Sequence, residues 1–136
     1  MSKPEFLSFS SAELMPQEEV LEVQKSNQQL QIAIPKETCM QERRVALTPD
    51  AVQLLVENGH ELIVETGAGE SAHYSDADYS EAGAKIVYSA KEAFEADMIL
   101  KIEPPSLAEI DLMKQNQTLI SALQLKTQQK EYFRKM

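Results

Sequence analysis

Cysteine, long apolar runs and basic charge are all scarce in this 136-residue sequence, and each scarcity excludes a class of protein. The single cysteine, Cys39, has no partner for an internal disulfide, which favours a reducing cytoplasm. No apolar run approaches the roughly 20 residues that a membrane-spanning helix needs, and the N-terminus carries no apolar segment typical of a secretion signal. Lysine and arginine number 13 against 22 acidic residues, so neither nucleic acid nor an anionic membrane is an expected partner.

The residues that are present are typical of a soluble globular protein. Hydrophobic residues make up 43% and charged residues 26%, which supplies one core in a chain of this length. Residues 1–29 are rich in Ser, Glu and Gln and are interpreted as an arm, with a short helix expected at 17–24. Residues 30–136 form the expected domain. The sequence stops inside a helical pattern, which predicts that this domain is a segment of a longer protein.

From residue 31 onward, short apolar segments alternate with segments that carry helix start signals. Thr48 before Pro49 is a typical helix N-cap, Ser75-x-x-Asp78 and Ser106-x-x-Glu109 resemble capping boxes, and Gly59 stands where a glycine commonly ends a helix. Strands are expected at 31–35, 61–66, 85–88, 97–102 and 118–123, with helices between them and from residue 128. This alternation predicts an α/β fold with a mostly parallel sheet of about five strands and helices on both faces.

The loop after the first expected strand carries two adjacent arginines, Arg43 and Arg44. In a parallel sheet the carboxyl ends of the strands share one edge, and ligands bind in the crevice along it. An arginine at this edge can hold a carboxylate or phosphate through two parallel hydrogen bonds. The alternative is a solvated arginine paired with Glu37 or Glu42. That alternative is less favoured for Arg44, which adjoins apolar residues.

Two further candidates fall at the same edge. Lys101 lies in the apolar run 97–102, where a charge is costly unless it has a purpose. Its ammonium can bind a carboxylate, polarise a carbonyl or exchange protons; the alternative is a strand-end lysine that extends to solvent. Gln124 follows the run 118–123, and its amide can orient a substrate but does not exchange protons. The alternative for Gln124 is an ordinary glutamine at a strand end.

The segment Gly67–Ala72 matches the pattern G-x-G-x-x-A, which binds dinucleotides when a helix begins directly on its glycines. Here the next helix start signal is Ser75, and Glu70 would set a negative charge beside the phosphates. We therefore interpret the segment as a glycine turn and expect no cofactor-binding residue in this chain. His73 in this loop is a candidate acid–base group, while His60 is expected at the opposite edge. No cysteine–histidine cluster has the spacing of a metal site.

The motifs IPKE, QERRVALTP, GHELIVETGAGE and ADMILKIEPP occur in this order between about residue 32 and at least residue 125. Together they resemble the N-terminal domain shared by alanine dehydrogenase and the alpha subunit of nicotinamide nucleotide transhydrogenase. The resemblance implies a Rossmann-like or flavodoxin-like substrate domain without the nucleotide fingerprint, and a separate Rossmann domain, absent from this chain, that binds NAD. It also implies oxidation of L-alanine to pyruvate and ammonia, with a small amino acid or 2-oxo acid as ligand, by a homo-oligomer.

The resemblance also implies roles for the candidate residues. By motif register, Arg44 binds the substrate carboxylate, Lys101 contacts the substrate, and Arg43 occupies a variable position. Alanine dehydrogenases carry an acid–base histidine where this chain has Gln124, so Gln124 and Lys101 are the catalytic candidates that remain.

Three hypotheses stay open at this point. The chain can be an NAD-dependent alanine dehydrogenase-like segment, inactive alone, in which Lys101 or a residue outside the chain takes the proton. It can be part of a transhydrogenase subunit, because those subunits also lack the histidine and pass hydride between NAD(H) and NADP(H). It can also be a binding or assembly module with no catalysis.

Overall fold

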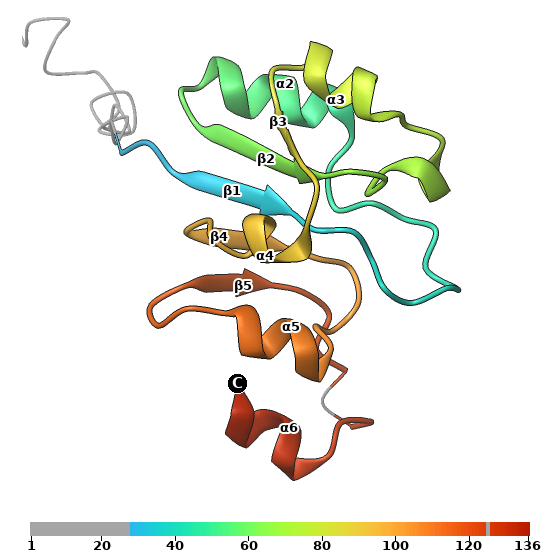
Figure 1. Ribbon diagram of the computed structural model, residues 1–136, viewed down its shortest axis with the longest axis vertical. Coiled ribbons are helices and arrows are strands. Elements are labelled where there is room, and N and C mark those ends of the chain that lie inside the picture. Colours follow the sequence, from blue (N-terminus) through green and yellow to red (C-terminus); the bar gives the residue numbers. More distant parts are fainter. Residues whose placement is uncertain (1–27, 125) are drawn as a thin grey trace, which may run out of the picture.

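Five parallel strands form the centre of the computed structural model, which describes residues 28–124 and 126–136 (Figure 1). The strands are β1 (Gln31–Ile34), β2 (Glu61–Glu65), β3 (Lys85–Val87), β4 (Met98–Leu100) and β5 (Thr118–Ile120). Their order in the sheet is β3-β2-β1-β4-β5, so the chain moves outward from β1 in one direction and then returns to build the other side. The predicted α/β fold and strand number are confirmed. The helix expected at 17–24 lies outside the described residues.

Helices cover both faces of this sheet. They are α2 (Pro49–Glu57), the short 3₁₀ helix η1 (Glu70–Ala72), α3 (Asp76–Glu81), α4 (Ala90–Ala93), α5 (Leu107–Leu112) and α6 (Lys130–Lys135). One core packs α2 and α3 against Ile32 and Ile34, and the other packs α4 against Ala33 and Ile99. Successive residues of β1 thus point to opposite faces, as the pleat of a strand requires. None of the helices in the described part is long and apolar enough to cross a bilayer.

The helix start signals in the sequence work as expected. The Thr48 side chain accepts a hydrogen bond from the Ala51 N–H, and Ser75 and Ser106 both form complete capping boxes. Gly59 follows α2 with φ +92°, a left-handed conformation that a side chain would disfavour. These caps satisfy orphan N–H groups and set where each helix begins, which fixes the direction of the loops at the carboxyl edge.

All five strands end before their predicted last residue, and the difference is largest for β4 and β5. β4 ends at Leu100, so Lys101 and Ile102 are not strand residues, and β5 ends at Ile120, four residues before Gln124. The neighbouring strand β1 has already ended at Ile34 and Pro35 follows, so β4 finds no further backbone partner on that side. The Glu37 side chain replaces the missing backbone partner and accepts a hydrogen bond from the Ile102 N–H at 2.7 Å.

Candidate functional site

A cavity of about 440 Å³ opens at the carboxyl edge of the sheet, where the sequence predicted a ligand site. Its walls come from the loop after β1, the end of β2, the glycine turn, the start of α4 and the middle of α5. The charged residues that line it are Lys36, Glu37, Glu42, Arg44, Glu65 and Glu109. Four of them belong to the loop after β1, Glu65 ends β2, and Glu109 lies in α5, which follows β4. The parallel topology therefore brings the ends of three strands together around the cavity.

Arg44 lines this cavity and is held from one side by Glu42. The Arg44 Nε donates to Glu42 Oε1 at 2.8 Å and Nη2 donates to Oε2 at 2.7 Å, while the Arg44 backbone N–H donates to Oε1 at 2.8 Å. The Glu42 side chain is buried, whereas the Arg44 side chain is 71% exposed. The salt bridge that the sequence offered as the alternative therefore exists, and it orients the guanidinium within the wall of the cavity.

The pairing with Glu42 leaves much of the guanidinium available. An arginine side chain has five N–H donors, and the two bonds to Glu42 use Nε and one hydrogen of Nη2. The remaining donors, two on Nη1 and one on Nη2, form the edge that matches a carboxylate with two parallel bonds. The hydrogen bonds to the Glu42 carboxylate raise the pKa of Arg44, and the negative charge of Glu42 adds to this effect, with smaller contributions from Glu103 and Glu37. Arg44 is thus a cation held in one orientation, with the Nη1–Nη2 edge of its guanidinium free to bind a ligand.

The Arg44–Glu42 pair predicts an acid-dependent loss of stability. The hydrogen bonds from the Arg44 side chain and backbone lower the pKa of Glu42 from 4.5 to about 2. A depressed carboxyl pKa contributes stability that is complete above the unfolded value and is lost as pH falls. We expect the urea midpoint of the wild type to fall between pH 4.5 and about 2 more steeply than that of Glu42→Gln. Parallel pH profiles of the two proteins, followed by circular dichroism, would contradict this assignment.

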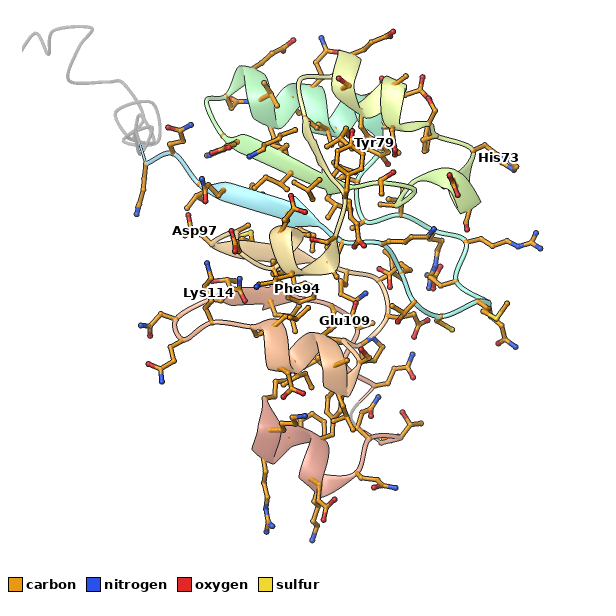
Figure 2. The ribbon with its side chains drawn as sticks, viewed as in Figure 1. His73, Tyr79, Phe94, Asp97, Glu109 and Lys114 are labelled. Carbon is orange, nitrogen blue, oxygen red and sulfur yellow. The ribbon has the colours of Figure 1, made fainter. Side chains whose placement is uncertain are left out.

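Lys101 does not extend to solvent, so the strand-end alternative is wrong. Its side chain is 0% exposed, and its Nζ donates to Glu37 Oε2 at 3.1 Å and to Glu109 Oε1 at 3.2 Å. Both carboxylates line the cavity, and Figure 2 shows Glu109 at the side of α5 that faces the sheet. Lys101 therefore lies directly behind the cavity wall. Two of its three N–H donors are used by these partners.

Gln124 lies near Lys101 and its partners, but its backbone is not that of the strand end that the sequence predicted. It is an exposed residue with φ +49° in an irregular segment, and its Nε2 donates to Glu103 Oε2 at 3.0 Å. The carbonyl of Gln124 also accepts hydrogen bonds from Thr127 at 2.9 Å. Glu103 in turn influences the pKa of Arg44. The structure thus brings Arg44, Lys101 and Gln124 into one neighbourhood, although Gln124 does not line the cavity.

The glycine turn packs tightly for reasons unrelated to phosphate. A Cβ on Gly69 would meet Tyr79 Cε2 at 2.5 Å and the Tyr74 carbonyl oxygen at 2.9 Å, so only glycine fits. A Cβ on Gly67, where φ is +75°, would lie 3.0 Å from the Lys36 ammonium. The helix that follows is the three-residue η1, so the geometry of a dinucleotide fingerprint is missing from this loop.

The other sequence candidates lie apart from the cavity. Arg43 is exposed and, unlike Arg44, is not among the lining residues. Figure 2 shows His73 on the outer side of its loop, pointing away from the sheet. His60 Nδ1 accepts from the Leu30 N–H at 3.4 Å near the amino ends of β1 and β2, at the edge predicted. Within residues 28–124 and 126–136, no three His, Cys, Asp or Glu side chains converge to hold a metal.

Sequence reasoning assigned no site role to three charged residues that line the cavity, Lys36, Glu65 and Glu109. Lys36 lines the cavity, and its ammonium forms no salt bridge with any described residue. Glu109 was predicted only as the acidic member of a capping box, and its Oε2 does accept from the Ser106 N–H at 2.7 Å. Its other oxygen holds Lys101, eight residues earlier. No signal in the sequence indicates that second bond, because it depends on how α5 folds back over the end of β4.

Comparisons with known proteins point to the same family as the sequence motifs. Residues 33–136 match the sequence model of the family described as alanine dehydrogenase/PNT, N-terminal domain. The alanine dehydrogenase of Staphylococcus epidermidis is 43% identical over 101 residues, which are 74% of this chain and 27% of that protein. Alanine dehydrogenase 2 of Staphylococcus aureus is 39% identical over the same shares of each chain. The chain therefore spans about a quarter of the length of these relatives.

Two solved structures share the fold. An L-alanine dehydrogenase superposes with a TM-score of 0.74 at 42% identity, covering 78% of this chain and 29% of that one. A transhydrogenase from Sinorhizobium meliloti superposes with a TM-score of 0.65 at 34% identity, covering 68% of this chain and 28% of that one. Because the family match covers most of the sequence and the fold agrees, the chain belongs to the alanine dehydrogenase/PNT N-terminal domain family.

Proposed function

We propose that this chain is the substrate-binding segment, residues 30–136, of an NAD-dependent oxidoreductase that interconverts L-alanine and pyruvate. In the oxidative direction, L-alanine, NAD⁺ and water give pyruvate, ammonium, NADH and a proton. The observation that carries the proposal is the Arg44 guanidinium, which lines the cavity with three N–H donors left over from its bonds to Glu42. The similarity to alanine dehydrogenases over 74% of the chain supports the choice of substrate.

Each cation has a distinct role in this proposal. Arg44 binds the substrate carboxylate through its free edge, since guanidinium and carboxylate are planar and complementary. Lys101 offers its third N–H to the carbonyl oxygen of pyruvate and stabilises the negative charge that grows there. Glu37 and Glu109 lie between the Lys101 ammonium and the cavity, so this contact requires the ligand to enter between their carboxylates.

The nicotinamide cofactor is bound elsewhere in this proposal. The Gly67–Ala72 turn lacks the helix N-terminus that holds a pyrophosphate, and Glu70 adds negative charge. NAD accepts or supplies the hydride when it is bound by a further domain outside this chain. The residues described here bind and orient the substrate, in a cytoplasmic enzyme that acts as an oligomer.

A second candidate function follows from Gln124. An amide neither takes up nor releases a proton at ordinary pH, and the Gln124 side chain is exposed and bonded to Glu103. A transhydrogenase-type subunit passes hydride between NAD(H) and NADP(H) and needs no acid–base group at this position. The similarity to the Sinorhizobium meliloti transhydrogenase supports this candidate. In the first candidate, Lys101 or a residue outside this chain takes the proton.

Steady-state assays of the complete oxidoreductase that carries this chain separate the two candidates. We expect NADH oxidation with pyruvate and ammonia, and no hydride transfer from NADPH to an NAD analogue. A gain in deamination rate after replacement of Gln124 with histidine would favour the alanine dehydrogenase proposal, because a positioned acid–base group contributes about 100-fold or more. Transfer between the two nicotinamides without deamination would reject the alanine dehydrogenase proposal and favour the second candidate.

A further inference from the structure

The Glu37 carboxylate accepts hydrogen bonds from three successive residues, 101 to 103, which lie behind the cavity wall. Glu37 Oε1 accepts from the Ile102 N–H at 2.7 Å, and Oε2 accepts from Lys101 Nζ at 3.1 Å and from the Glu103 N–H at 3.4 Å. These bonds span 64 to 66 positions of sequence. Glu37 belongs to the loop after β1, so a single side chain fastens that loop to the segment that follows β4.

The same loop carries Arg44. Glu37 and Arg44 both line the cavity, and the charge of Glu37 contributes to the electrostatic environment of the guanidinium. Lys101 has a second anchor in Glu109, whose Oε2 is already fixed by the Ser106 N–H. The ammonium is thus held from two elements, the loop after β1 and helix α5, and its position relative to Arg44 depends on Glu37.

A purely stabilising role explains this arrangement poorly. A buried ion pair loses much of its Coulomb energy to desolvation, so it contributes little net stability compared with apolar packing. What such a group does supply is a defined geometry. The Lys101 side chain is fully buried, and Glu37 uses both oxygens on atoms of residues 101–103.

We propose that Glu37 is a positioning residue that sets the distance and angle between the Lys101 ammonium and the Arg44 guanidinium, so that both meet one 2-oxo acid. The identity of the substrate in this inference rests on the proposed function. The placement of the two cations by Glu37 does not. Glu109 supports the same ammonium from the opposite side. The substrate contacts Arg44 and Lys101, and Glu37 acts through them.

The first test uses this chain and reads geometry without any substrate. In a sample labelled with ¹⁵N-lysine, the Lys101 ammonium is expected to exchange slowly with water, and Glu37→Gln is expected to speed that exchange by about tenfold or more, the factor that corresponds to 1.4 kcal/mol. Glu61→Gln is the matched control, because Glu61 also bridges two strands, through Gln31 at 2.8 Å, but at the opposite edge. Equal exchange in all three proteins would overturn the positioning role.

The second test uses the complete oxidoreductase. Glu37→Gln keeps an acceptor for the Ile102 N–H and removes the charge that faces Lys101. We expect kcat/KM for pyruvate to fall by about 100-fold, the effect of a small misplacement of catalytic groups, while KM for NADH stays unchanged. Glu37→Asp, which keeps the charge on a shorter stem, is expected to lie between the wild type and Glu37→Gln. If Glu37→Gln does not fold, Glu37→Asp serves as the test variant in its place.

The outcomes separate this inference from the proposed function. If Glu37→Gln folds, lowers the thermal midpoint and leaves kcat/KM for pyruvate at the wild-type value, then Glu37 is merely structural and the inference is wrong. If the wild-type oxidoreductase does not act on pyruvate, the proposed function fails and the ammonium exchange alone decides the inference. Faster exchange in Glu37→Gln but not in Glu61→Gln would then still support it.

Discussion

Replacing Lys101 with methionine is expected to destabilise this chain by about 3 to 5 kcal/mol, because it leaves buried carboxylates without their counter-charge. Glu37 and Glu109 both contact the Lys101 ammonium, and both side chains are less than one-tenth exposed. Methionine fills a similar volume, so loss of packing contributes little to the effect. The free energy of unfolding in urea measures it, with the m-value as a check that the transition stays two-state.

A triple variant shows whether Lys101→Met loses stability through unpaired buried charges or through poorer packing. Lys101→Met combined with Glu37→Gln and Glu109→Gln leaves no unpaired buried charge, so most of the lost stability is expected to return. Pyruvate turnover by the complete oxidoreductase is expected to stay lost, because no ammonium remains. Lys114→Met is the matched control: Lys114 lies at the other edge of the sheet, and its Nζ donates to the Glu95 carbonyl at 3.0 Å (Figure 2). A stable Lys101→Met single variant would contradict the buried charge network.

Replacing Arg44 with lysine is expected to raise KM for pyruvate by roughly 10- to 100-fold in the complete oxidoreductase, with little change in folding stability. The range corresponds to about 1.5 to 3 kcal/mol for hydrogen bonds to a charged group. Lysine keeps the charge but loses the planar edge that binds a carboxylate with two bonds. The change in stability is expected to be small because lysine keeps a positive charge beside the buried Glu42 carboxylate. The backbone N–H of residue 44 also still donates to Glu42 Oε1.

Arg43→Lys is the internal control for this experiment. The two arginines are adjacent in the sequence, but Arg43 is exposed and does not line the cavity. We expect its KM for pyruvate to equal that of the wild type. If Arg43→Lys and Arg44→Lys changed KM equally, general electrostatic attraction would explain the effect and the specific role of Arg44 would be wrong.

Much of the fold could be predicted from the sequence because its signals are local. Thr48, Ser75 and Ser106 each cap a helix through atoms within three residues, so the helix starts are encoded where they occur. The placement of Arg44 and Lys101 at one edge followed from the parallel sheet alone, since all carboxyl ends meet there. The extent of β4 was overestimated because it depends on where β1 ends and on the Glu37 side chain, which accepts the next N–H in place of β1. The extent of β5 was overestimated with it, because β5 pairs only with β4.

The partners of the site residues could not be predicted in the same way. The Lys101–Glu109 bond needs α5 to fold back over the end of β4, and the Lys101–Glu37 bond joins residues 64 positions apart. Sequence periodicity shows that Lys101 adjoins a buried strand, but not whether its charge is exposed or neutralised. Gln124 shows the same limit, since its left-handed backbone and its bond to Glu103 have no local signal.

If the cavity at the carboxyl edge binds a 2-oxo acid through Arg44, a pyruvate titration of the ¹⁵N-labelled chain will detect that contact. We expect saturable shifts of the Arg44 Nε–H signal and of the amides of residues 36–40, and we expect the amide shifts to be lost in Arg44→Lys. A second cavity of about 550 Å³ lies between α5 and α6, lined by Ser106, Thr127 and Tyr132 among others. Shifts that gather there, or that persist unchanged in Arg44→Lys, would show that Arg44 does not bind pyruvate in the cavity at the carboxyl edge.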